Sequence, residues 1–301
     1  MNDARVHESV LSFACEGEQL VGVLSRPADM ASDLALLVVV GGPQVRTGSH
    51  RQFTTLCRAI AMSGVPALRF DVRGMGDSSG SLHTFERIGP DIGAALDALQ
   101  ATLPQVRRVV LWGLCDGASA ALMYTHERIA TRGPDQRVTG LVLINPWVRS
   151  SQTLARAHVK HYYWDRLRQG QFWRKLLRGN VARQATRDLL GNLRAAFKGA
   201  SPTADVGGGA AATPFQDRML RGAETFSGPV LWVLSGRDYT AKEFAELAAT
   251  SARWQAALGR PSVSRLDVPE ADHTFSKLSD GHALATATAK WMKETMGAPA
   301  A

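Results

Sequence analysis

Strands and helices alternate along most of the chain, and this alternation predicts an α/β fold with a mostly parallel central sheet and helices on both faces. Continuous apolar runs such as DLALLVVV (33–40) are typical of strands buried on both faces. Segments with helical periodicity separate one such run from the next. With 301 residues and 45% hydrophobic content, the chain is long enough to bury a large core.

The elements of this fold are expected in a regular order. Residues 6–14 and 19–25 begin the chain as a hairpin of two strands. The pattern then predicts strand 33–40, helix 49–63, strand 65–70, helix 86–102, strand 106–114, a helix from residue 115, and strand 138–145. After an interruption it predicts strand 228–238, helix 241–258, strand 262–269 and helix 277–296.

The interruption divides the chain into a core, 1–147 and 227–301, and an inserted helical lid, 148–226. Apolar residues four positions apart predict a helix in the lid, and ADVGGGAAATP (204–214) is typical of a flexible connector. The segment 149–222 has 14 Lys or Arg against four Asp, a net charge of +10 in a chain whose total is +8. A strongly basic face is therefore expected.

The three cysteines lie far apart, without a CxxC pair, which favours neither a disulfide framework nor a zinc site. Cys15 and Cys57 are expected to be small buried side chains. Cys115 differs because GLCDG (113–117) lies between a buried strand and a helix, with the spacing of a nucleophile elbow. The helix N-terminus is expected to lower the pKa of its thiol. A buried cysteine in a glycine-rich turn is the alternative.

Other motifs agree with the elbow. DVRGMGDSSG (71–80) and VGGPQ (40–44) each follow a buried strand, Asp238 ends another, and His273 follows the last. The sequence therefore resembles the α/β-hydrolase superfamily, with cysteine as the nucleophile in place of serine. Within it, GGPQVRTGSHRQF and GLCDGASAAL most resemble the exosortase A system-associated hydrolases of type 1, and dienelactone hydrolases more distantly. That resemblance implies a setting near exopolysaccharide production and protein sorting in Gram-negative bacteria.

The resemblance and the chemistry together suggest roles for the site residues. Cys115 would attack a carbonyl carbon, His273 would accept the thiol proton, and Asp238 would orient the imidazole. The backbone N–H groups of Asp116 and Gly42 would form the oxyanion hole. Gln44 is an alternative second donor, whereas Pro43 has no N–H.

Several other residues are candidates for the site. Asp272 is an alternative acid for the triad, and Ser119 is expected to pack within its helix. Possible substrate contacts are His50 and Arg51 at the mouth of the site and Tyr162, Tyr163 and Trp164 in the lid, where aromatic side chains either pack the lid or line an acyl channel. His158 and His161 have no cysteine or carboxylate nearby to complete a metal site, so neither a metal nor a cofactor is expected.

A cysteine nucleophile suits activated acyl donors such as thioesters, lactones and enol esters. The predicted function is acyl hydrolysis through an acyl-cysteine intermediate; an acyltransferase and a non-catalytic binding scaffold are the alternatives. The basic lid is either simply solvated or meets an anionic partner, namely an acyl carrier protein, coenzyme A, an acidic saccharide or a membrane surface; nucleic acid is not expected. Since no leader and no apolar run of about 18 residues is present, a soluble cytoplasmic protein is expected.

Overall fold

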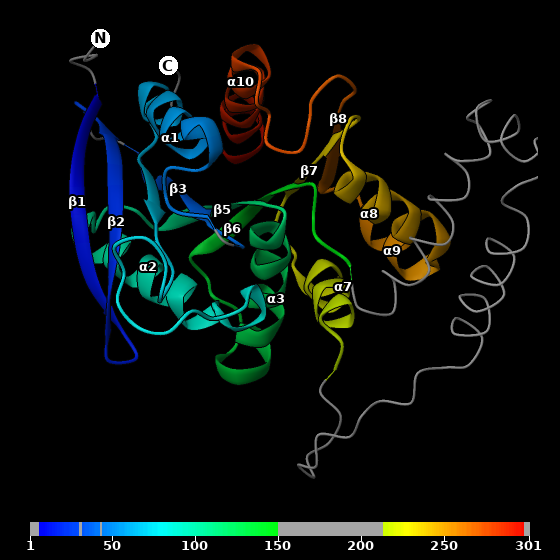
Figure 1. The fold of residues 1–301 in the computed structure, drawn as a ribbon, viewed down its shortest axis with the longest axis horizontal. Coiled ribbons are helices and arrows are strands. Elements are labelled where there is room, and N and C mark those ends of the chain that lie inside the picture. Colours follow the sequence, from blue (N-terminus) through cyan, green and yellow to red (C-terminus); the bar gives the residue numbers. More distant parts are fainter. Residues whose placement is uncertain (1–5, 30–31, 43, 150–212, 298–301) are drawn as a thin grey trace, which may run out of the picture. The chain divides into compact units, whose positions relative to one another are not determined.

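The computed structural model describes residues 6–29, 32–42, 44–149 and 213–297. Within these residues, eight strands form one sheet in the order β1-β2-β4-β3-β5-β6-β7-β8 (Figure 1). The strands are β1 (Val6–Cys15), β2 (Glu18–Pro27), β3 (Leu34–Val39), β4 (Ala67–Phe70), β5 (Arg108–Leu114), β6 (Val138–Ile144), β7 (Val230–Ser235) and β8 (Val263–Val268). Strands β3 to β8 are parallel, and β2 pairs antiparallel with both β1 and β4. The predicted fold class and the opening hairpin are confirmed.

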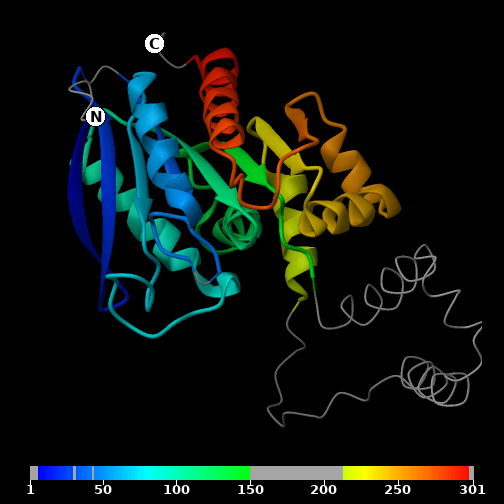
Figure 2. The ribbon, with the colours of Figure 1, turned by 45° about the horizontal axis from the view of Figure 1, so that its top comes forward.

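Helices cover both faces of this sheet (Figure 2). On one face lie α1 (Gln52–Met62) and α10 (Leu278–Met296). On the other lie α2 (Gly89–Thr102), α3 (Asp116–Arg132), α7 (Phe215–Thr225), α8 (Tyr239–Thr250) and α9 (Ala252–Leu258). Side chains of β3 alternate between the two layers: Leu36 and Val38 pack towards α1 and α10, and Leu37 and Val39 pack towards the other helices. Every residue of β3 is buried, as its continuous apolar sequence predicts.

Three helical segments differ from their predicted bounds. The predicted helices 49–63 and 86–102 each begin with a short 3₁₀ turn, Ser49–Arg51 and Phe85–Arg87. The predicted helix 241–258 is two helices, α8 and α9. Ser251 separates them because its backbone is extended and its side chain caps α9 by accepting a hydrogen bond from the Trp254 N–H.

The C-terminal part of the predicted lid belongs to the core. Helix α7 packs against α3, and Thr213–Ala301 lies in the same compact unit as Met1–Val148. Arg218 of α7 forms ion pairs with Glu86 and with Glu127 of α3, so one of the cations counted in the basic segment 149–222 is already paired with the core. The remainder of the predicted lid, 150–212, lies outside the described residues. None of the described helices is long and apolar enough to cross a membrane.

The parallel strands bring the candidate residues to one edge of the sheet. Cys115 directly follows β5, Asp238 follows β7 after two residues, and His273 lies in the loop after β8. Because β5, β7 and β8 run in the same direction, their carboxyl ends meet at this edge. Open α/β sheets bind their ligands at such an edge.

Candidate active site

Cys115 occupies a strained turn between β5 and α3. Its φ and ψ are 57° and −120°, a conformation that costs a non-glycine residue about 1–3 kcal/mol. The flanking glycines permit the turn. A Cβ atom at Gly113 would lie 2.4 Å from the carbonyl carbon of Gly117, and one at Gly117 would lie 2.2 Å from the Val39 carbonyl oxygen. The backbone of GLCDG thus forms the sharp strand-to-helix bend that its spacing predicts.

The thiol of Cys115 is half-buried and donates a hydrogen bond to its neighbour Asp116, with Sγ 3.3 Å from Oδ1. Burial above all, and then the negative charge of Asp116, raise the pKa of the Cys115 thiol well above its usual range. The expectation of a lowered thiol pKa is therefore wrong. Loss of solvation and the adjacent carboxylate outweigh the favourable helix N-terminus, so the resting group is a thiol.

His273 and Asp238 lie within hydrogen-bonding distance, with 2.8 Å between Nδ1 and Oδ2. The Asp238 carboxylate is almost fully buried, whereas the imidazole is partly exposed. The hydrogen bond to Asp238 raises the pKa of His273 above its ordinary value of 6.5, although burial acts in the opposite direction. The Asp238 side chain also caps α8 by accepting from the N–H groups of Thr240 and Ala241. These contacts fix the carboxylate that faces the imidazole.

Asp272, the alternative acid for the triad, makes its hydrogen bonds within its own turn. Its carboxylate accepts hydrogen bonds from the Thr274 N–H, the Ser276 N–H and the Ser276 hydroxyl. These bonds, led by the one from the Ser276 side chain, lower the pKa of Asp272. Asp272 thereby stabilises the turn that presents His273, within the segment 269–277 that we call the histidine loop.

Asn145, which directly follows β6, helps to hold the loop that carries His273, and the sequence analysis missed it. Its side-chain amide donates to Ser235 Oγ at 2.9 Å and to the His273 carbonyl at 3.4 Å, and its Oδ1 accepts from the Ser235 N–H. Asn145 therefore connects β6, β7 and the histidine loop. A polar residue at the carboxyl end of an otherwise apolar strand was the available signal.

Gly41 and Gly42 of VGGPQ (40–44), the segment that we call the oxyanion loop because it is expected to supply the second donor, lie against the elbow. A Cβ atom at Gly41 would be 2.2 Å from the Gly117 nitrogen, and one at Gly42 would be 3.1 Å from Asp116 Oδ2. The structure thus brings Gly42 and Asp116 together, and glycine is required where the two segments meet. The Asp116 side chain, also missed by the sequence analysis, lies between the thiol and this loop, and burial raises its pKa.

The remaining candidates are placed as follows. Gln44, the last residue of the oxyanion loop, is half-buried, whereas His50 and Arg51 are exposed and precede α1. Ser119 is fully buried and donates to the Trp147 carbonyl at 2.7 Å, as expected of a packing serine. Outside the described residues lie Tyr162, Tyr163, Trp164, His158 and His161. No cluster of potential metal ligands occurs among the residues that are described.

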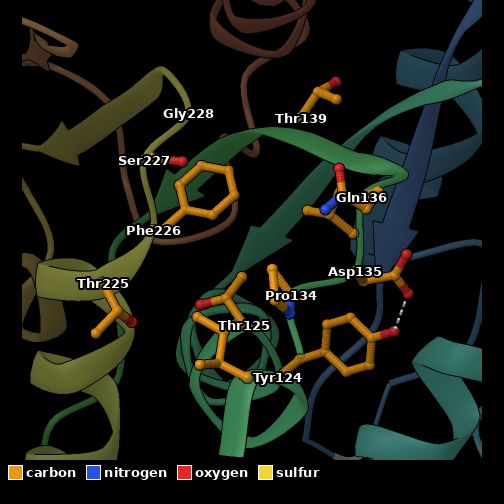
Figure 3. A pocket seen from close by; sticks show the side chains of 12 residues that line it. Tyr124, Thr125, Pro134, Asp135, Gln136, Thr139, Thr225, Phe226, Ser227 and Gly228 are labelled. Carbon is orange, nitrogen blue, oxygen red and sulfur yellow. Dashed lines mark hydrogen bonds between the residues drawn. The ribbon is translucent and has the colours of Figure 1, made fainter. Parts of the chain in front are cut away.

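A cavity of about 300 Å³ lies at the opposite edge of the sheet, where the parallel strands begin (Figure 3). Its wall includes Thr139 near the start of β6 and Gly228 just before β7. Tyr124 donates to Asp135 there, with 2.7 Å between the oxygens. The amino ends of β6 and β7 are remote from the elbow at the carboxyl end of β5, so this cavity is separate from the candidate site.

Comparison with known proteins agrees with this fold. The model of the alpha/beta hydrolase family matches residues 36–287. One similar solved structure is an esterase of Pyrococcus furiosus, with a TM-score of 0.61 and 16% identity over 97% of this chain and 92% of that one. A second is the Butyrivibrio proteoclasticus protein Est1E with ferulic acid bound, with a TM-score of 0.61 and 15% identity over 95% of this chain and 99% of that one. A third is a dienelactone hydrolase of Anabaena variabilis, with a TM-score of 0.59 and 14% identity over 97% of this chain and 99% of that one. At these identities the structures establish a common fold. Curated protein sequences gave no match.

Proposed function

Because the chain belongs to the α/β-hydrolase family, we propose that it is an acyl hydrolase in which Cys115 is the nucleophile, His273 the base and Asp238 the residue that orients the base. One observation supports this proposal above all. His273 Nδ1 lies 2.8 Å from Asp238 Oδ2, at the sheet edge where the elbow presents Cys115. This contact leaves the other ring nitrogen, Nε2, free to exchange a proton with the thiol.

The first half of the reaction forms an acyl-cysteine. As the Cys115 sulfur attacks the carbonyl carbon, its proton passes to His273 Nε2, and the carbonyl oxygen becomes negatively charged. The backbone N–H groups of Gly42 and Asp116 stabilise that oxygen. The carbon–leaving group bond then breaks, and the leaving group takes the proton from His273.

The second half releases the acyl group. Water attacks the thioester, His273 accepts a proton from that water, and collapse of the tetrahedral intermediate yields a carboxylic acid and the restored thiol. An amine or alcohol in place of water would make the same intermediate an acyl-transfer step. Product analysis with and without an added amine separates these two activities.

Two features suggest the class of substrate. Burial and Asp116 raise the pKa of the Cys115 thiol, which favours its protonated form, so an activated acyl donor such as a thioester, lactone or enol ester is the best substrate. The segment 150–212 holds eleven Lys or Arg against three Asp, a net charge of +8. We therefore favour an anionic donor, carried by coenzyme A or an acyl carrier protein, over a neutral ester.

The cellular setting is also part of the proposal. Cys15, Cys57 and Cys115 are all free thiols, and free thiols are kept reduced in the cytoplasm, so we favour that compartment. The motifs GLCDG and GGPQ support a place among the exosortase A system-associated hydrolases of type 1.

Intact-protein mass spectrometry tests the nucleophile. After incubation with acyl thioesters and p-nitrophenyl esters, the acyl mass should appear on the wild-type chain and map to Cys115. Cys115→Ala should lose this adduct and the turnover while keeping the wild-type circular dichroism spectrum. Cys57→Ala, at a buried cysteine, is the control that should retain both. Wild-type turnover in Cys115→Ala would reject the proposal.

Salt dependence tests the anionic donor. The second-order rate constant with an acyl-coenzyme A should fall as the salt concentration rises, because dissolved ions screen the attraction between charges. At physiological ionic strength the Debye length, which sets the range of that attraction, is about 8 Å. A small neutral ester should show little change. Charge reversal at Arg166, Arg168, Arg174 and Lys175 should reproduce the loss for the anionic donor alone. Equal salt responses would reject steering by this segment and leave the chemistry at Cys115 unaffected.

A further inference from the structure

A small cavity lies on the α1/α10 face of the sheet, between the amino-terminal parts of these two helices, and we call it the α1–α10 cavity. Its volume is about 80 Å³. The wall combines apolar side chains with hydrogen-bonding ones and includes His50, Gln52, Trp112, Phe275, Leu278 and His282. Leu278, at the start of α10, is 71% exposed, so an apolar side chain borders the cavity on its solvent side.

Two hydrogen-bond donors in this wall lack an acceptor. Trp112 is 2% exposed, and its Nε1 is buried without a partner among the described residues. The same holds for the Nε2 atom of Gln52, at the first position of α1. Buried donors of folded proteins are nearly always satisfied by protein, water or ligand. Both residues line one cavity, so the two side chains with unsatisfied donors border the same space.

The backbone around the cavity is strained. His50 and Phe275, both in the wall, have φ angles of 53° and 52°, and Arg51, which joins His50 to Gln52, has a φ of 60°. Residues with side chains rarely adopt this left-handed conformation, and it is concentrated at functional sites. The strain therefore coincides with the unpaired donors at one location.

The chemistry of the wall restricts the occupant. Apart from the two histidines, no lining side chain is ionisable, and a carboxylate would lose its hydration among apolar groups. Water would satisfy the donors but would gain nothing from Leu278 and Phe275. An apolar cavity of about 150 Å³ holds benzene, so half that volume suits a few heavy atoms.

We propose that the α1–α10 cavity is a binding site for a small uncharged carbonyl compound, whose oxygen accepts hydrogen bonds from Trp112 Nε1 and Gln52 Nε2 while its alkyl groups contact the apolar wall. A carbonyl oxygen has two lone pairs and can accept both bonds at once. Acetone and N-methylacetamide have this chemistry and approximately this size. The site is independent of the proposed acyl chemistry, although Phe275 belongs to the histidine loop.

Titration of the ¹⁵N-labelled full-length protein with acetone or N-methylacetamide tests the site. The indole N–H signal of Trp112, identified by its loss in Trp112→Phe, should shift along a saturable curve. Trp291 provides the matched control because its Nε1 is also buried and unpaired among the described residues but is not part of this wall. Its signal should not move. Gln52→Leu should weaken binding about fivefold by removing one donor.

Each other outcome overturns the proposal. If the Trp112 signal is unmoved, the cavity does not bind the compound, and if it moves together with that of Trp291, the shift is a general solvent effect; either result rejects the site. Tighter binding of acetate than of acetone would show that the histidines select an anion. If Trp112→Phe does not fold, the side-chain amide signals of Gln52, identified by their loss in Gln52→Leu, replace the indole as reporter. Binding to Cys115→Ala should equal binding to the wild type, so failure of the proposed acyl chemistry would leave this test valid.

Discussion

The nucleophile elbow and the histidine loop deliver side chains to the same edge of the sheet by different means. The elbow is held by close backbone packing, since Cβ atoms at Gly113 and Gly117 would lie 2.4 and 2.2 Å from other backbone atoms. The histidine loop is held by hydrogen bonds that the carboxylates of Asp238 and Asp272 accept from it and that the Asn145 amide donates to it. Packed backbone cannot admit another atom, whereas one hydrogen-bonding side chain can replace another. The two regions should therefore differ in their tolerance of substitution.

Gly117→Ala should have the largest effect. The new methyl group would lie 2.2 Å from the Val39 carbonyl oxygen, so β3 and α3 must separate or the elbow must change its path. We expect a loss of about 1–3 kcal/mol or more in the free energy of unfolding and no measurable esterase activity. Chemical denaturation and an ester assay measure the two quantities.

Gly93→Ala is the matched control for this substitution. Gly93 lies inside α2, and a Cβ atom there would meet its nearest neighbour, Tyr124 Oη, at 3.8 Å. Alanine should be neutral or stabilising at such a helical position, by up to about 1 kcal/mol. Equal unfolding free energies for the two variants would show that close packing does not hold the elbow.

Asp238→Asn should have the next largest effect, on rate and not on folding. Asparagine also caps helices, so α8 should remain intact. The amide neither favours the required imidazole tautomer nor stabilises the imidazolium, and kcat/KM should fall by about a hundredfold or more. Activity and thermal unfolding of the same preparation separate the two effects. An unchanged rate would exclude Asp238 as the orienting residue.

The pH profile sharpens this prediction. Catalysis by His273 requires its neutral form, so kcat/KM should rise with pH as the imidazole loses its proton. The hydrogen bond to Asp238 raises the pKa of His273, which places the wild-type midpoint above 6.5. Removal of the carboxylate charge should move the midpoint of the residual activity to lower pH. A midpoint that does not move would mean that another group controls the rising limb.

The same comparison explains how much the sequence could predict. The spacing of Gly113, Cys115 and Gly117 between an apolar run and a helical pattern is a local signal, so the elbow and its strand-to-helix context were predictable, although the contact that excludes a Cβ atom at Gly117 is with the distant Val39. The alternation of strands and helices along the chain, which predicted a mostly parallel sheet with helices on both faces, followed from apolar periodicity. The break at Ser251 and the return of α7 to the core depended on side-chain capping and on packing between distant segments, which local patterns do not encode.

Electrostatics was the least predictable part of the site. Proximity to a helix N-terminus suggested a low thiol pKa, but the direction of the shift depends on burial and on where the Asp116 carboxylate points. The direction of the Asp116 carboxylate depends on rotation about a side-chain bond, which the residue type alone does not specify. The role of Asp272 in its own turn was similarly dependent on side-chain conformation.

Asp272→Ala should have an intermediate effect. Loss of its bonds to the Thr274 and Ser276 N–H groups should loosen the histidine loop and lower kcat/KM about tenfold, because small misplacements of reacting groups are costly. Asp272→Asn keeps an oxygen that can accept these bonds and should retain most of the activity. Steady-state kinetics of both variants tests the claim. Equal losses in the two would point to the charge of Asp272 instead of its hydrogen bonds.

Asp116→Asn should have the smallest effect, and in the opposite direction. Burial and the Asp116 carboxylate both raise the pKa of Cys115. Asparagine removes the charge but keeps an oxygen near the thiol, so the pKa should fall while burial still holds most of the sulfur protonated. Alkylation by iodoacetamide at neutral pH depends on the thiolate fraction and should accelerate about threefold, which corresponds to about half a pKa unit.

A charge-matched control separates this local effect from net charge. Asp267→Asn removes one negative charge from an exposed position on β8. Because iodoacetamide is neutral, the rate of Cys115 alkylation in this variant should equal that of the wild type. An equal acceleration in both variants would assign the effect to overall charge. No acceleration in Asp116→Asn would mean that burial alone keeps the thiol protonated. In that case the elbow would determine the acidity of its nucleophile through packing alone, and side-chain interactions would tune only the histidine loop.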